Sequence, residues 1–355
     1  RGATTIAGEA RNPFKGLASF TEADAGDFRG RQRLVARLLA ALERPGVAGR
    51  LVAAVGPSGS GKSSVVRAGL IPALRHGALS GSADWFLTTM MPGAHPFEEL
   101  EGALMRVAAA PPGPLVESMA ETDRGIARAV KHVIPDERSE LVLVIDQFEE
   151  LFTLVDEEDR RARFIEGLLA AVKEPRSRLR VVLTVRADFW DRPLRYPALA
   201  SLLETAAVTV SPLSADELER VIVDPVTEQG MAYEPGLVAR ITAEVVDQPG
   251  ALPLLQYALT ELFDRNVSGL LTAEEFDAMG GVGGSLAQRA EDIHETLTRD
   301  QQEATRRLFG RLVTLGDGSA DTRRRVTVAE VGNDATTAQV IEAFGQARLL
   351  SFDRH

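Results

Sequence analysis

The sequence contains no cysteine, which excludes a disulfide framework and any zinc site built from thiolates. It also lacks an apolar run of about 18 residues, the length that a membrane-spanning helix needs. Its five histidines show no metal-ligand spacing. We therefore expect a soluble protein of the cytoplasm that has no membrane partner.

Positive charge is also in short supply. Lysine and arginine number 40 against 51 aspartates and glutamates, which gives a formal net charge of −11. Such a chain has no general attraction for nucleic acid, so we do not expect nucleic acid as a partner. With 355 residues it exceeds the usual single domain and predicts two or three packed units. It begins at Arg1 without a signal-peptide pattern, and we expect a piece of a longer protein.

Apolar runs alternate with helical stretches in the first part of the chain. After a polar tail over 1–11, strands are predicted at 51–55, 85–90, 141–145, 179–185 and 206–210. This alternation predicts an α/β fold, with a mainly parallel sheet and helices on both faces. We assign this domain to residues 12–211.

Beyond residue 211 the strand signals stop. Capping-box spacing at Ser214 and Thr272, together with helical periodicity, predicts an all-helical lid domain over 212–297. Residues 298–355 start with a helix, and a β-rich segment at 325–328 and another helix follow. That order predicts a winged-helix domain, which we expect to be incomplete at its C-terminal end.

A glycine loop follows the first predicted strand. The pattern G-x-x-x-x-G-K-[ST] is matched by Gly56, Pro57, Ser58, Gly59, Ser60, Gly61, Lys62 and Ser63. In such a loop, backbone N–H groups and a helix N-terminus hold nucleotide phosphates. We predict that Lys62 reaches the β- and γ-phosphates, that Ser63 supplies a hydroxyl to Mg²⁺, and that Ser64 touches the α-phosphate. The implied ligands are ATP or ADP with Mg²⁺.

Carboxylates follow the apolar run at 141–145. Asp146 directly ends this run, and beside a phosphate loop it is predicted to hold the water shell of Mg²⁺. Glu149 or Glu150 would orient the attacking water as a general base, with Glu149 the first choice. The alternative is that one or both glutamates lie on a solvated helical turn.

Two further residues are candidates for contacts with the nucleotide. Arg186 ends a buried strand, at the sheet edge where ligands of α/β proteins bind, and is predicted to sense the γ-phosphate. The alternative is a structural ion pair with Asp188 or Asp146. Pro253, between two predicted helices, would pack on the adenine or simply separate the helices.

Together these motifs resemble the STAND NTPases, in particular the bacterial novel STAND group that is often fused to WD40 repeats. The segments that carry the resemblance are 12–17, 28–31, 56–63, 146–152, 186–189, 250–255 and 280–284. The resemblance implies a P-loop NTPase of the ASCE type with sheet order 5-1-4-3-2, followed by a helical and a winged-helix domain. It places Phe28 and Arg31 beside the adenine.

The resemblance also implies a slowly hydrolysing signalling switch, closed over ADP and opened by ATP. Opening would drive self-association, and effector and sensor domains of the same protein would lie N-terminal and C-terminal to this sequence. Regulation of transcription is one candidate output. Two details depart from the family pattern: one extra residue separates Gly250 from Pro253, and His355 lies outside any motif matching the family's closing histidine.

Two other functions suit the same residues. An AAA+-like motor or loader would act on DNA through the winged helix, although the acidic charge and the absence of a clear arginine finger argue against it. A nucleotide-dependent scaffold would bind ATP without hydrolysing it, and both glutamates would then be structural.

Overall fold

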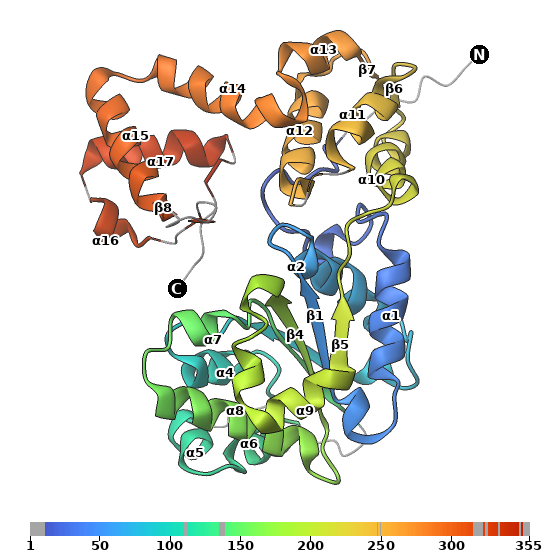
Figure 1. The fold of residues 1–355 in the computed structure, drawn as a ribbon, viewed down its shortest axis with the longest axis vertical. Coiled ribbons are helices and arrows are strands. Elements are labelled where there is room, and N and C mark those ends of the chain that lie inside the picture. Colours follow the sequence, from blue (N-terminus) through green and yellow to red (C-terminus); the bar gives the residue numbers. More distant parts are fainter. Residues whose placement is uncertain are drawn as a thin grey trace. The chain divides into compact units, whose positions relative to one another are not determined.

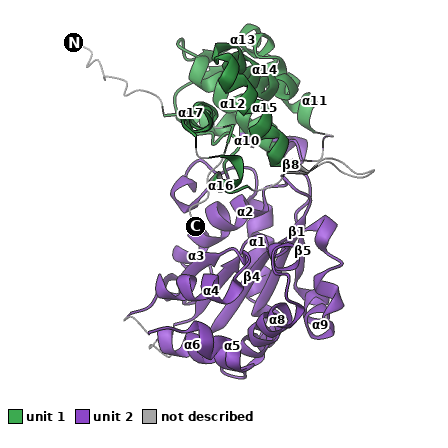
Figure 2. Ribbon diagram, turned by 90° about the vertical axis from the view of Figure 1, so that its left-hand side faces the viewer, with its two compact units in different colours: residues 1–18, 222–247, 252–355 green, residues 19–221, 248–251 purple. Residues whose placement is uncertain are grey.

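The computed structural model describes residues 11–109, 113–134, 139–246, 248, 250–314, 322–323, 326–332, 334–347 and 349–350. The chain divides into two compact units, coloured in Figure 2. The sheet unit comprises residues 19–221 and 248–251, and the helical unit comprises 1–18, 222–247 and 252–355. The division falls within one helix, and the predicted domain limits at 211 and 297 stay predictions.

A five-stranded parallel sheet forms the centre of the sheet unit, in the order β2-β3-β4-β1-β5. Figure 1 labels three neighbouring strands of it, β4, β1 and β5. Its strands are β1 (Leu51–Gly56), β2 (Phe86–Met90), β3 (Leu141–Ile145), β4 (Leu179–Arg186) and β5 (Ala207–Thr209). Counted from the other edge, this is the order 5-1-4-3-2 that the resemblance implied. The predicted α/β P-loop NTPase fold is confirmed.

Both faces of this sheet are covered. Along β3, Leu141, Leu143 and Ile145 enter one apolar core, whereas Val142 and Val144 enter the other. Alternate side chains of a strand point to opposite faces, so a strand buried on both sides is apolar throughout. This explains why the strands appear in the sequence as continuous apolar runs.

Helices of the sheet unit complete the two cores. The first core is filled by α4 (Pro96–Met105), α5 (Val116–Glu121), α6 (Gly125–Val133), α7 (Glu150–Thr153), α8 (Glu158–Lys173) and α9 (Pro197–Ala206). The second core is filled by α1 (Gln32–Leu42), η3 (Val65–Leu70) and α3 (Ile71–Arg75). Together with the preceding α2 (Lys62–Ser64), η3 and α3 form one continuous helix, in which the N–H of Ile71 bonds to Val66 O, five residues back. This spacing makes η3 a π-helical segment.

The helical unit contains helices that come after the sheet in the chain. They are the second half of α10 (Ala215–Glu228), α11 (Leu237–Val245), α12 (Leu252–Arg265), α13 (Ala273–Ala278) and α14 (Gly281–Thr296). The predicted capping boxes form at Ser214 and Thr272. The expectation of helices alone is wrong in one place, because β6 (Ala232–Tyr233) pairs in parallel with β7 (Leu270–Leu271). These strands are only two residues long, too short for a visible alternation in the sequence.

The N-terminal segment is attached to α12. Asn12 Nδ2 donates to Thr260 O at 3.0 Å and to Asp264 Oδ1 at 2.7 Å. Phe14 is buried, with its ring edge-on to Phe263 at 6.4 Å between centroids. The Asn-Pro-Phe motif at 12–14 therefore has a structural task.

The C-terminal elements are α15 (Arg299–Leu312), β8 (Val313–Thr314), β9 (Thr322–Arg323), α16 (Val328–Val331) and α17 (Ala335–Gln346). α15 and α17 share an apolar core, and β8 pairs antiparallel with β9. The prediction of a β-rich segment at 325–328 is wrong where the structure describes it. Thr327 and Glu330 form a capping box that starts α16 instead. The winged-helix assignment stays a prediction, and His355 lies outside the described residues.

Across the described residues, no helix has both the length and the apolar character needed to cross a membrane.

The apolar centre of β3 gives a test of this fold. Leu143→Ala removes a fully buried side chain, and we expect it to lower the free energy of unfolding of the sheet unit by about 2–5 kcal/mol. Leu154→Ala, at a site that is 44% exposed, is the control and should change it by less than about 0.5 kcal/mol. Urea denaturation followed by tryptophan fluorescence measures this, because both tryptophans, Trp85 and Trp190, lie in that unit.

Candidate functional site

The glycine loop connects β1 to the helix that starts at Lys62. Gly59 and Gly61 have φ angles of +72° and +85°, in the left-handed region that side chains with a Cβ avoid. Gly61 directly precedes the helix, so the loop turns sharply and brings backbone N–H groups to the helix N-terminus. The backbone conformation of the turn therefore explains why the loop has glycine at these two positions.

Lys62 is buried, and its ammonium group bonds back to the loop. Its Nζ donates to Gly56 O at 2.9 Å and to Pro57 O at 2.7 Å. Burial lowers the pKa of Lys62, and the charge of Glu149 partly opposes this shift. These two hydrogen bonds of the buried cation go to neutral carbonyl groups, and a phosphate would be a stronger partner.

Asp146 is the most densely bonded group of the site. It is 1% exposed and directly follows β3. Its Oδ1 accepts from Ser63 Oγ at 2.8 Å and from Thr184 Oγ1 at 2.6 Å, and its Oδ2 lies 2.8 Å from Arg67 Nη2. The structure brings the predicted pair Ser63 and Asp146 together. Sequence reasoning missed Thr184 and Arg67, although Arg67 lies four residues after Ser63 and hence on the same helix face.

A strained residue follows Asp146. Gln147 has a φ angle of +55°, the only positive value among the non-glycine residues described. Its N–H donates to Thr184 Oγ1 at 2.9 Å, and the N–H of Phe148 donates to Thr184 O at 2.9 Å. These bonds to β4 hold the left-handed turn in place. Such strain occurs at functional sites, and here it lies between Asp146 and the two glutamates.

The structure separates the two glutamates. Both are 6% exposed, so neither lies on a solvated turn, as one sequence alternative held. Glu149 Oε2 accepts from the N–H of Arg186 at 3.2 Å, and its charge acts on Lys62. Glu150 Oε2 instead accepts from the N–H of Gly93 at 3.4 Å, in the loop after β2. Glu149 is thus tied to the strand end that carries Arg186.

Arg186 ends β4 and lies opposite Gly56 of β1 in the sheet register. Its guanidinium makes two bonds to Asp188, with Nε to Oδ1 at 3.1 Å and Nη2 to Oδ2 at 2.6 Å. It also stacks over Phe189 at 5.2 Å from the ring centroid. The ion pair with Asp188 that the sequence left open is present.

The donor set next to the loop fits Mg²⁺ that arrives with a nucleotide. Mg²⁺ prefers oxygen ligands and commonly takes one or two from the protein and the rest from phosphates and water. Ser63 Oγ and Asp146 Oδ1 lie together, 2.8 Å apart. In the described part of the chain, no group of three or more His, Cys, Asp or Glu could hold a metal ion unaided. The buried Ser60 Oγ finds no hydrogen-bond partner among the described residues.

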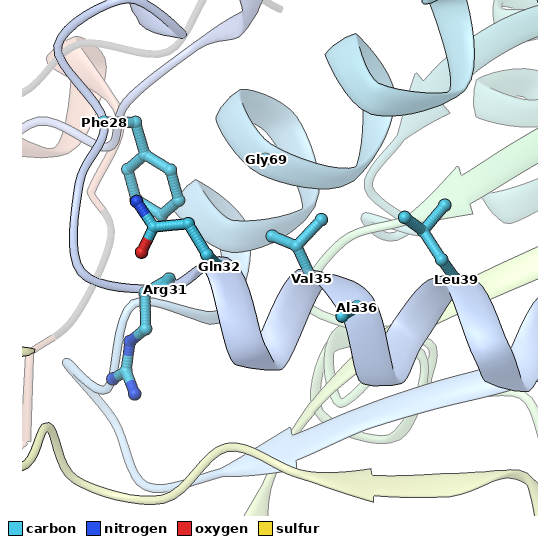
Figure 3. Close-up of a pocket in the computed structure, with 7 residues that line it drawn as sticks. All are labelled: Phe28, Arg31, Gln32, Val35, Ala36, Leu39 and Gly69. Atoms are coloured by element: carbon cyan, nitrogen blue, oxygen red, sulfur yellow. The ribbon is translucent and has the colours of Figure 1, made fainter. Parts of the chain in front are cut away.

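A pocket of about 260 Å³ lies between α1 and η3. Its lining residues, shown in Figure 3, are Phe28, Arg31, Gln32, Val35, Ala36, Leu39 and Gly69. A Cβ on Gly69 would come within 2.6 Å of Val35 Cγ2 and 3.3 Å of Phe28 Cε1, so only glycine permits this close approach of the helices. The Arg31 guanidinium donates instead to Ser60 O at 2.9 Å and to Ser211 O at 2.8 Å. It braces the glycine loop.

Two predicted contacts stay predictions. The Ser64 hydroxyl accepts from the N–H of Phe20 at 3.2 Å. Pro253, the second residue of α12, belongs to the helical unit, whereas Gly250 belongs to the sheet unit. A Cβ on Gly250 would lie 3.3 Å from Ser58 O, so the segment that leads into α12 begins against the glycine loop.

Burial raises the pKa of Glu149, while backbone hydrogen bonds and the charges of Lys62 and Arg186 act to lower it. The folded state thus binds this proton more tightly than the unfolded state does, and ionisation costs stability above the unfolded pKa of about 4.3. Glu149→Gln should therefore be more stable than the wild type at pH 7 without nucleotide. The difference should shrink as the pH falls toward 4.3.

Urea denaturation of both proteins at several pH values checks this. A stability difference that stays constant with pH would contradict the assigned origin of the shift. Glu166→Gln, on the exposed side of α8, is the matched control and should show no such trend.

Comparisons with known proteins bear on the family and the fold of the chain. The family model for novel STAND NTPase 1 matches residues 13–355. The ORC1 protein of Aeropyrum pernix in complex with DNA is similar over 90% of this chain and 84% of that chain, at 16% identity and a TM-score of 0.50. At this identity the likeness concerns the fold alone.

Two further solved structures are more distant. Cdc6p from Pyrobaculum aerophilum covers 89% of this chain and 80% of its own length, at 14% identity and a TM-score of 0.44. Drosophila ORC bound to DNA is similar over 99% of this chain and 85% of that chain, at 15% identity and a TM-score of 0.47. No curated protein matches the sequence. With its family model matched over nearly the whole length and its P-loop fold in place, the chain belongs to the novel STAND NTPase 1 family.

Proposed function

We propose that this chain is a nucleotide-operated switch that binds ATP or ADP with Mg²⁺ and hydrolyses ATP slowly. The observation that carries the proposal is the bond of Ser63 to Asp146 at the carboxyl edge of the sheet, directly beside the glycine loop. These are the groups that a P-loop NTPase needs for a metal–nucleotide complex. Membership in the family supports the use of a nucleotide, and the role as a switch is what we propose in addition.

Each residue of the loop has a distinct task in this proposal. Lys62 exchanges its bonds to Gly56 O and Pro57 O for phosphate oxygens, while Gly59 and Gly61 leave room for phosphate next to the backbone. Mg²⁺, when bound with the nucleotide, neutralises phosphate charge. Ser63 and Asp146 would hold it and its waters.

Glu149 is our proposed general base. Its carboxylate is buried on the side of Lys62 and Arg186, and burial raises its pKa, which favours a group that must accept a proton. Glu150 is directed to the backbone of Gly93, and we assign it a structural role. The choice that the sequence left open thus falls on Glu149.

Arg186 is our proposed γ-phosphate sensor. Because Asp188 already neutralises its charge, a γ-phosphate must replace that carboxylate as the partner of the guanidinium. Only ATP offers the replacement, so the exchange gives ATP and ADP different effects. A full population reversal from 1:99 to 99:1 requires a difference of about 5.5 kcal/mol between the two states.

The base of the nucleotide would lie against Phe28, at the pocket between α1 and η3. Arg31 would act there by bracing Ser60 in the glycine loop. Pro253 is a further candidate for contact with the base. Self-association on ATP binding, and control of effector and sensor domains elsewhere in the same protein, complete the proposed switch. Transcription is one output that such a switch could regulate.

Nucleotide affinity tests the central claim. Lys62→Ala removes the charged donor to the phosphates, and we expect binding of a fluorescent ADP analogue to weaken about 10- to 100-fold. Lys173→Ala, at an exposed site on α8, is the matched control and should bind like the wild type. Equal affinity of the Lys62 variant and the wild type would show that the loop does not bind nucleotide.

Hydrolysis tests the assignment of the base. Glu149→Gln keeps the size of the side chain but cannot accept the proton, so ATP turnover should fall about 10²–10⁴-fold while ADP binding persists. Glu150→Gln, its equally buried neighbour, is the control and should stay within a few-fold of the wild type. Phosphate release in single-turnover experiments measures both. A larger loss in the Glu150 variant would reverse the assignment.

A further inference from the structure

We propose that Arg67 is a built-in counter-ion of Asp146 that competes with Mg²⁺, and that it thereby sets the Mg²⁺ concentration the nucleotide site requires. The proposal rests on the proposed function. It concerns a residue to which neither the glycine-loop pattern nor the predicted metal pair assigns a task.

Arg67 takes the one carboxylate oxygen that the hydroxyl groups leave available. Ser63 and Thr184 both bond to Oδ1 of Asp146, whereas Arg67 Nη2 lies 2.8 Å from Oδ2. The Asp146 side chain is 2% exposed. A buried carboxylate needs a counter-ion, because an unpaired charge in the interior is strongly destabilising. Lys62 does not supply it directly, since its Nζ bonds to Gly56 O and Pro57 O.

The helix geometry directs Arg67 to this oxygen. Arg67 lies within the π-helical segment η3, four residues after Ser63 and on the same face. Its side chain is 28% exposed, so it can move away from Asp146 toward solvent. Its Nε is buried and has no hydrogen-bond partner among the described residues. The guanidinium is therefore held at Asp146 by its outer nitrogen alone, a contact that can be released.

Mg²⁺ and Arg67 compete for the carboxylate of Asp146. Two positive charges within a few ångströms of each other repel, so the cation that enters with the nucleotide must displace the guanidinium or bind less tightly beside it. Arg67 thus neutralises Asp146 in the nucleotide-free state and raises the Mg²⁺ concentration at which the nucleotide is held firmly. Binding of Mg²⁺ therefore includes the free-energy cost of breaking or weakening the ion pair between Arg67 and Asp146.

The test measures binding of a fluorescent ADP analogue to the full chain as a function of free Mg²⁺. Arg67→Met should lower the half-saturating Mg²⁺ concentration about three- to tenfold. Arg67→Gln, which keeps a polar group, should do the same and serves if the methionine variant does not fold. Arg75→Met, on the same continuous helix but paired with Glu22, is the matched control and should leave the Mg²⁺ requirement unchanged.

A double-variant cycle identifies the partner. In an Asp146→Asn background the effect of Arg67→Met on the Mg²⁺ requirement should vanish, because the contested carboxylate is gone. An unchanged or higher Mg²⁺ requirement in both Arg67 variants would overturn the proposal. If the wild type itself bound no ADP at any Mg²⁺ concentration, the proposed function would fail as well, so the two failures are distinguishable.

Stability supplies a second readout. Arg67→Met should lower the urea midpoint of the sheet unit in EDTA, because Asp146 then lacks its counter-ion. With saturating Mg²⁺ and ADP the loss should be much smaller, since Mg²⁺ takes over that task. An equal loss under both conditions would mean that Arg67 has only a structural role.

Discussion

The carboxylate of Asp146 is the point on which the site depends. It accepts hydrogen bonds from the helix after the glycine loop and from β4, while its own backbone continues from β3. Because it is buried, its charge must be compensated locally, and each partner is thereby fixed in place. One anion thus connects three elements that are distant in the sequence. The sheet order that places β4 between β3 and β1 makes this meeting possible.

The charges around the loop are arranged as exchangeable pairs. Lys62 is held by carbonyl groups, Arg186 by Asp188, and Asp146 by Arg67. In the proposed function, a phosphate or a metal ion replaces the present partner in each case. Under that proposal the site is stable before its ligand arrives and is rearranged by it.

Much of the fold was predictable, because continuous apolar runs and the glycine loop are local patterns. The five strands and the parallel sheet follow from them, as does the position of the helix that starts at Lys62. Short elements were not predictable. The two-residue strands β6 and β7 exist only because Tyr233 and Leu271 are brought together by the fold. At Thr327 a capping box prevailed over the β-branched residues around it.

The sequence by itself determined which residues we propose for the chemistry, since Gly61, Lys62, Ser63 and Asp146 belong to motifs whose spacing is set by local backbone geometry. Only the tertiary structure decided which groups surround them. Our proposal of Glu149 rather than Glu150, and the addition of Thr184 and Arg67, depend on contacts with β4, with the loop after β2 and with the helix after the glycine loop. Adjacent glutamates are equivalent in a sequence. They differ here because consecutive side chains of the turn after Gln147 point in different directions, that of Glu149 to the N–H of Arg186 and that of Glu150 to the N–H of Gly93.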